Sequence, residues 1–257
     1  MRNNKWFKFG RLLYLLVFLS LEAFIYSLFI LADFDFNVEI DSSLYKYESI
    51  ILIVIFFFSN FVINMLLERI DKDYVKEIRY DMIIVGIALL FTLLSDTFLL
   101  YLNSHYVLGV LSFIVVQLLY FFRMIYGLKF SNKRRNTSII IRASLGALAI
   151  IVLLILNSLS FHYAITAIYF INIVMNFVDA LISTIHLHND KRFISLVLFT
   201  VGLLLFIGCD IFVGISNLLS IGGSVIWIFY LPSQVLISLS GSRLFGLTLG
   251  EEVTTNE

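Results

Sequence analysis

Long apolar runs separated by short polar clusters occupy nearly the whole chain. A helix that crosses a membrane needs roughly 20 consecutive apolar residues, because it rises only about 1.5 Å per residue through the hydrocarbon layer. The runs predict eight membrane spans, at about 12–32, 49–67, 82–102, 107–127, 138–156, 163–186, 194–214 and 223–243. The pattern is typical of an all-α, polytopic membrane protein. We expect one transmembrane domain over residues 1–257, ending in a short cytoplasmic tail at 244–257.

The composition supports the same class. Hydrophobic residues make up 60% of the 257 positions, and the mean hydropathy is +0.98. A soluble domain of this size could not cover so much apolar surface. The first apolar run is long and lacks a small-residue cleavage site, so it is predicted to be a retained helix and not a signal peptide. The formal net charge is zero, which gives no indication of nucleic-acid binding, and the expected partners are membrane lipids.

The basic residues predict an orientation. With the N-terminus in the cytoplasm, eight spans place nearly all lysines and arginines near the inner ends of the helices, and only Lys46 falls outside. The inner clusters are Arg2, Lys5, Lys8 and Arg11; Arg69, Lys72, Lys76 and Arg79; Arg123, Lys129, Lys133, Arg134, Arg135 and Arg142; Lys191 and Arg192; and Arg243. This bias is the positive-inside rule. It predicts an integral protein of a bacterial plasma membrane with both termini in the cytoplasm.

Two segments of the chain share one arrangement of polar residues. Asp96 precedes Gln117 by 21 residues (117 − 96), and Asp210 precedes Gln234 by 24 (234 − 210). The third and seventh spans run in the same direction, as do the fourth and eighth. The pattern therefore predicts a parallel internal repeat, related by an axis along the membrane normal. We expect one carboxyl group from each half to meet at a shared site.

Polar groups inside the spans are the candidates for function. An ionisable group in the hydrocarbon costs roughly 3 kcal/mol or more, so Asp96 and Asp210 are interpreted as functional. In the sixth span Tyr169, Asn172, Asn176, Asp179, Ser183 and His186 recur at helical spacing and form one stripe. Hydrogen bonding between helices is the favoured reading for the asparagines. For Glu22 and Asp179 a structural and a functional role remain equally open, and either is a possible partner of Arg123.

Several familiar chemistries do not fit the sequence. His105 and His162 fall on outer loops, whereas His186 and His188 lie at the inner end of the sixth span, so a histidine-rich metal site is not expected. The chain has no Walker motif and no Gly-x-Gly-x-x-Gly, and we expect no cofactor. Carboxyl chemistry remains. Two neighbouring carboxyls in a low-dielectric site can act as a general acid and a general base. Such a pair suits hydrolysis of an acid-labile enol ether.

At these residues the chain resembles the YhhN-like lysoplasmalogenase family of integral membrane proteins. The resemblance covers roughly residues 82–240. It rests on Ser95-Asp96 followed by Phe98-Leu-Leu, on Gly109 to Phe113 leading into Gln117-Leu-Leu-Tyr120, on Cys209-Asp210, on Gln234-Val-Leu-Ile237, and on Tyr169, Met175 and Ala180. Ser95 and Gln117 stand where members often carry glycine and histidine, and a lysine–proline pair common near the second span is missing.

The resemblance implies hydrolysis of the vinyl ether bond of lysoplasmalogens, a class of lysophospholipid, to a fatty aldehyde and a glycerophospho-head group. Asp96 and Asp210 would be the acid–base pair. The candidates for orienting water or substrate are Gln117, Gln234, Tyr120, Tyr230, Asn176 and Asp179. An alternative is a proton-coupled transporter or lipid-binding membrane protein that uses the same aspartates. A third is a membrane scaffold without a site.

Overall fold

The computed structural model of the protein describes residues 5–34, 42–68, 75–127, 130–190, 192–219 and 224–242. Within these ranges the regular structure is helical throughout. The helices are α1 (Lys5–Phe34), α2 (Ser42–Glu68), α3 (Val75–Asp96), the π-helical turn η1 (Thr97–Tyr101), α4 (Tyr106–Gly127), α5 (Asn132–Ile155), α6 (Phe161–His186), α7 (Phe193–Leu219) and α8 (Ser224–Ser242). Each α-helix contains a segment long and apolar enough to cross a membrane, so the prediction of an all-α protein with eight spans is confirmed.

Four helices, α1, α2, α3 and α5, begin six or seven residues earlier than the hydropathy pattern predicts. α2 begins at Ser42 and not at 49, and α5 begins at Asn132 and not at 138. In α5 the side chain of Ser131 accepts a hydrogen bond of 3.2 Å from the backbone N–H of Arg134, which caps the helix. In α2, Lys46 donates to the Ser42 hydroxyl at 2.8 Å. Polar first turns of this kind continue a helix beyond its apolar segment.

Five helices close into a ring. α3 packs on α4, α4 on α6, α6 on α7, α7 on α8, and α8 again on α3. α4 and α8 face each other across the ring: the rings of Phe113 and Tyr230 lie 6.4 Å apart, and Arg123 Nη1 donates to Ser240 Oγ at 2.7 Å. Both contacts join residues 117 positions apart (230 − 113 and 240 − 123), so the two helices run parallel and in one register.

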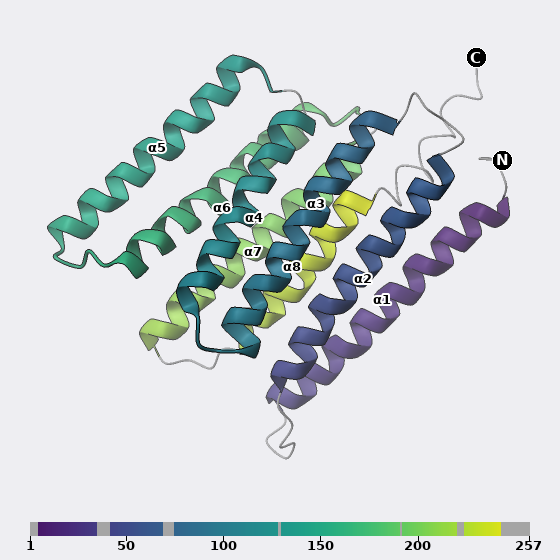
Figure 1. Ribbon diagram of the computed structural model, residues 1–257, viewed down its shortest axis with the longest axis horizontal. Helices are drawn as coiled ribbons and strands as arrows, with labels where there is room; N and C mark the ends of the chain where they lie inside the picture. The colour runs from purple at the N-terminus through teal and green to yellow at the C-terminus, as the bar shows by residue number, and fades with distance from the viewer. Residues whose placement is uncertain are drawn as a thin grey trace.

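The other three helices lie outside the ring. α2 packs against α3 and α8, α1 packs against α2, and α5 packs mainly against α6. Figure 1 shows the consequence, with α1 and α5 at opposite edges of the bundle. Most of α5 is exposed, including large apolar side chains such as Ile140, Leu148 and Ile155. In a bilayer these side chains face lipid, because exposing an apolar surface of this extent to water is unfavourable.

The single proline creates a contact between distant helices. Pro232 lies inside α8 and has no N–H group, so the carbonyl of Ile228 loses its partner within the helix. The hydroxyl of Tyr26 on α1 donates to that carbonyl at 3.4 Å. α1 is therefore tied to α8 through a backbone group that the proline leaves unpaired.

Charged contacts differ between the two ends of the bundle. Near one end Arg192 donates to the carbonyl of Gly127 at 2.6 Å, which joins the loop before α7 to the end of α4. Near the other end Lys46 forms an ion pair of 2.8 Å with Asp33. The placement of both termini in the cytoplasm stays a prediction, as does the parallel repeat. The predicted tail at 244–257 lies outside the described residues.

Candidate functional site

Asp96 occupies the last position of α3, where the α-helix is followed by a π-helical turn. The next five residues form η1, in which the N–H of Leu102 bonds the carbonyl of Thr97 at 2.8 Å. Short π-helical segments are frequent at functional sites. The Asp96 side chain is 3% exposed, and its Oδ2 accepts a hydrogen bond of 2.7 Å from the hydroxyl of Tyr230 on α8. The carboxyl group therefore lies inside the ring and is oriented by a phenol from another helix.

A close approach between α4 and η1 holds this region in place. A Cβ atom added to Gly109 would lie 2.4 Å from Cγ of Leu99, so only glycine lets the two segments meet at this distance. The carbonyl of Gly109 also accepts a hydrogen bond of 2.7 Å from the hydroxyl of Ser95. Ser95 directly precedes Asp96, and the start of α4 therefore fixes the backbone that carries the carboxyl.

Asp210 lies in the second half of α7, and its carboxyl group also accepts a hydrogen bond from a tyrosine. The hydroxyl of Tyr169 on α6 donates to Asp210 Oδ2 at 2.7 Å. Asp210 itself is half-buried, whereas Tyr169 is buried. A hydrogen bond from a neutral hydroxyl to a carboxyl oxygen orients that oxygen as an acceptor. Both predicted catalytic residues are thus engaged in the same way.

The two aspartate–tyrosine pairs meet around one aromatic side chain. The ring of Phe113 on α4 lies 5.8 Å from that of Tyr169 and 6.4 Å from that of Tyr230. Phe206 packs edge-on against both Phe113 and Tyr230, at 5.6 and 5.5 Å. Among the hydrogen bonds of the described residues, none joins the two carboxyls directly. The two pairs therefore converge on one aromatic cluster, and a site shared by the two carboxyls stays a prediction.

A second layer of polar groups lies one to two turns further along the helices. Gln117, Tyr120 and Gln234 are fully buried. Three side-chain atoms of this layer have no hydrogen-bond partner in the described part of the chain, namely Gln117 Nε2, Gln234 Oε1 and Ser238 Oγ, whereas the hydroxyl groups of Tyr120 and Thr92 interact with each other. A buried unpaired polar atom costs about 1–3 kcal/mol. Such a concentration on α4 and α8 is typical of a place that receives a polar ligand or water.

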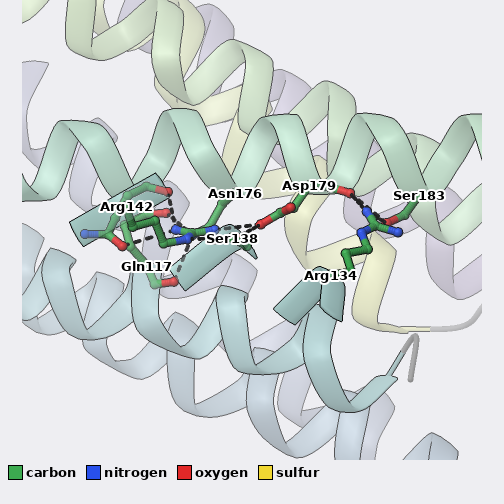
Figure 2. A network of polar contacts seen from close by, with 8 residues as sticks. Gln117, Arg134, Ser138, Arg142, Asn176, Asp179 and Ser183 are labelled. Atoms are coloured by element: carbon green, nitrogen blue, oxygen red, sulfur yellow. Dashed lines mark hydrogen bonds and ion pairs between the residues drawn. The ribbon is translucent and has the colours of Figure 1, made fainter. Parts of the chain in front are cut away.

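The predicted polar stripe of α6 divides among three neighbours, of which α7 receives Tyr169. Asn176 Nδ2 donates to Gln117 on α4, to Oε1 at 2.9 Å and to the backbone carbonyl at 2.8 Å. Asp179 faces α5 instead, where it pairs with Arg142 at 2.9 Å and accepts from Ser138 at 2.7 Å (Figure 2). His186 is exposed. The structure therefore brings Asn176 to the ring interior and engages Asp179 with α5, ten residues (about 15 Å) along α6 from Tyr169.

The partner of Arg123 is a residue that sequence reasoning did not single out. Its guanidinium binds Asp81 on α3 through Nε and Nη2, at 2.7 and 3.1 Å. It also donates to the hydroxyl and the carbonyl of Ser240, at 2.7 and 3.1 Å. Arg123 thus joins three helices near the predicted cytoplasmic end of the ring. Neither Glu22 nor Asp179 pairs with it, because Glu22 accepts from Ser49 at 2.6 Å and Asp179 binds Arg142.

The roles of two further residues could not be predicted from the sequence. Tyr169 belonged to the predicted stripe, but its pairing with Asp210 depends on how α6 faces α7. Arg142 was counted among the basic residues of an inner loop, whereas it lies inside α5 with its side chain 9% exposed. The signal in the sequence that could have indicated this role is the position of Arg142 within an apolar run. The described residues contain no group of three His, Cys, Asp or Glu side chains able to hold a metal ion.

Comparison with known proteins yields one match. A family model described as the YhhN family matches residues 43–241, which include the whole site and all of the ring except Ser242, the last residue of α8. No curated protein matches the chain, and no solved structure does.

Proposed function

Since the chain belongs to the YhhN family, we propose that it is an intramembrane hydrolase that cleaves the vinyl ether bond of lysoplasmalogens. The products are a fatty aldehyde and a glycerophospho-head group. The observation that carries the proposal is the pair of intramembrane aspartates, each of which accepts a 2.7 Å hydrogen bond from a tyrosine. The two tyrosines pack on one phenylalanine, Phe113, which supports the assignment of both carboxyls to one site.

The proposed reaction needs one proton donor and one proton acceptor. A carboxylic acid transfers its proton to C2 of the vinyl ether, and the C1–O unit becomes an oxocarbenium ion. The other carboxylate takes a proton from water while the water oxygen bonds to C1. The resulting hemiacetal loses the glycerol oxygen, which leaves with a proton as an alcohol, and the aldehyde forms. One water molecule is consumed, and Asp96 and Asp210 together return to their starting protonation.

The tyrosines and glutamines have supporting roles in this proposal. Tyr230 and Tyr169 each occupy one carboxyl oxygen, which leaves the other oxygen of each aspartate for proton transfer. Gln117 and Gln234 supply the buried unpaired groups that orient water or substrate, and the hydroxyl of Tyr120 is a further candidate for that role. Asn176 acts on Gln117 through its hydrogen bond. The proposal gives Asp179 no direct contact with substrate, because its carboxyl is engaged by α5.

The test is aldehyde release from a lysoplasmalogen by the purified protein in detergent. We expect release by the wild type and its loss in Asp96→Asn and Asp210→Asn variants that remain folded. In D₂O the aldehyde should carry one deuterium at C2, because that carbon receives the proton in the first step. Authentic aldehyde incubated with the protein controls for later exchange. Absence of aldehyde from every vinyl ether lysolipid would contradict the proposal and favour proton-coupled transport or lipid binding.

A further inference from the structure

Arg142 is the centre of a polar network between α5 and α6. Its Nη2 donates to Asn176 Oδ1 at 3.0 Å and to Asp179 Oδ2 at 2.9 Å. Its Nη1 donates to Asn172 Oδ1 at 3.1 Å, and its Nε donates to Ser138 Oγ at 3.3 Å. Figure 2 shows the guanidinium beside Ser138 and Asn176, with Asp179 on one side and Gln117 on the other. The network therefore continues from the exposed helix α5 to the interior of the ring.

The network determines the orientation of the Asn176 and Gln117 side-chain amides, that is, which neighbour each amide oxygen and nitrogen faces. A guanidinium has only donors, so the amide of Asn176 must present its oxygen to Arg142. The nitrogen of Asn176 then donates to Gln117 Oε1 at 2.9 Å. This leaves Nε2 as the remaining end of the Gln117 amide, and that atom is buried without a partner among the described residues. Arg142 thus sets Gln117 to offer a hydrogen-bond donor.

Gln234 offers the complementary group at the same level of the ring. Its Nε2 donates to Ser233 Oγ at 3.3 Å, and its Oε1 is buried without a partner in the described ranges. Gln234 and Gln117 are again 117 positions apart (234 − 117), the separation that relates facing residues of α4 and α8. A free donor on α4 and a free acceptor at the corresponding position of α8 match a hydroxyl group, which both accepts and donates.

We propose that Arg142 is a positioning residue that acts through Asn176, and that Gln117 and Gln234 bind the free glycerol hydroxyl of a lysolipid. This inference rests on the proposed function for the identity of the substrate. It gives a physical reason for selecting a lysolipid over a lipid acylated at that oxygen, since an ester oxygen cannot donate to Gln234. A water molecule has the same hydrogen-bonding chemistry and is the other candidate occupant.

Binding of two probes that cannot be hydrolysed separates these possibilities. One is a lysophospholipid with a saturated ether chain and a free 2-hydroxyl group, and the other is its 2-deoxy analogue. The full-length protein in detergent should bind the hydroxyl probe about tenfold more tightly or better, the effect of one buried hydrogen bond left unmade. Gln117→Met, which keeps the side-chain length, and Arg142→Gln should both reduce this ratio towards one.

A second arginine on α5 provides the matched control. Arg134 also ties α5 to α6, by donating to Ser183 Oγ at 2.9 Å and to the carbonyl of Asp179 at 3.0 Å, but it makes no bond to Asn176. Arg134→Gln should therefore leave the probe ratio at the wild-type value. Arg142→Lys retains the charge beside Asp179 without the planar fork, and it should give an intermediate ratio. Thermal unfolding of each variant shows that it is folded.

Each result decides the inference separately from the proposed reaction. A wild-type ratio near one would overturn recognition of the hydroxyl, whether or not aldehyde is released. If Gln117→Met keeps the wild-type ratio of probe affinities and only kcat falls, the two glutamines bind water and not the lipid hydroxyl. That result would also overturn the inference. An equal loss of the probe ratio in Arg134→Gln would mean that Arg142 only attaches α5 to α6 and does not position Gln117. A high ratio lost only in the Gln117 and Arg142 variants, together with no hydrolysis, would support the inference and contradict the hydrolase.

Discussion

The hydroxyl of Tyr230 on α8 donates a 2.7 Å hydrogen bond to Asp96 at the end of α3, a neighbouring helix of the five-helix ring. The same relationship recurs between Tyr169 on α6 and Asp210 on α7, two other neighbours in the ring. Each carboxyl group is thus oriented by a phenol from the helix beside its own.

Removing either phenolic hydroxyl should impair the site without removing its aromatic packing. Tyr230→Phe leaves a buried oxygen of Asp96 without its donor, a loss of about 1.5–3 kcal/mol. We expect aldehyde release to fall by about ten- to a hundredfold, and Tyr169→Phe to act similarly through Asp210. Steady-state kinetics check both. Tyr80→Phe, at an exposed position, should match the wild type, and unchanged kinetics in Tyr230→Phe would contradict a role for the phenol.

Glycine at position 109 should be essential for the position of Asp96. In Gly109→Ala the new Cβ would overlap Leu99, so α4 or η1 must move, at a cost of about 1–3 kcal/mol. We expect lower thermal stability together with reduced activity. Adding Leu99→Ala makes room for the methyl group and should restore part of both. Gly146→Ala, where no atom lies within 4 Å of the new Cβ, should have no such effect.

The buried ion pair of Arg123 and Asp81 should dominate the stability of one end of the ring. Arg123→Ala leaves Asp81 as an uncompensated charge, and we expect the free energy of unfolding to fall by about 3–5 kcal/mol. The double variant Arg123→Leu, Asp81→Leu should recover much of that loss. Chemical or thermal unfolding in detergent measures both. Asp190→Asn, in a partly exposed pair with Arg192, should change stability by at most about 1 kcal/mol.

Chelation should leave the proposed activity intact. The reaction as we propose it moves protons between carboxyl groups and water, and no step uses a metal-bound species. Aldehyde release measured before and after dialysis against EDTA should be the same. Activity that disappears on chelation and returns with an added divalent cation would contradict the carboxyl mechanism.

Much of the fold could be predicted because the information is local. The number and approximate limits of the spans follow from the length of each apolar run, and every predicted span overlaps an observed helix. The choice of Asp96 and Asp210 also followed from local information, since an acidic residue in an apolar run is costly wherever it occurs. The starts of α1, α2, α3 and α5 were predicted six or seven residues too late, because a hydropathy pattern does not register a polar first turn.

The partners of the polar residues were decided only by tertiary structure. The sequence places Tyr169, Asn176 and Asp179 on one stripe of a helix, but the stripe is wide enough to face three neighbours. The way α6 sits between α4, α5 and α7 directs these side chains to Asp210, Gln117 and Arg142, respectively. Apolar runs determine that helices form and span a membrane, whereas the choice of facing helix depends on the packing of the whole bundle. The sequence by itself therefore determined the spans and the two carboxyls, and the tertiary structure decided which groups orient them.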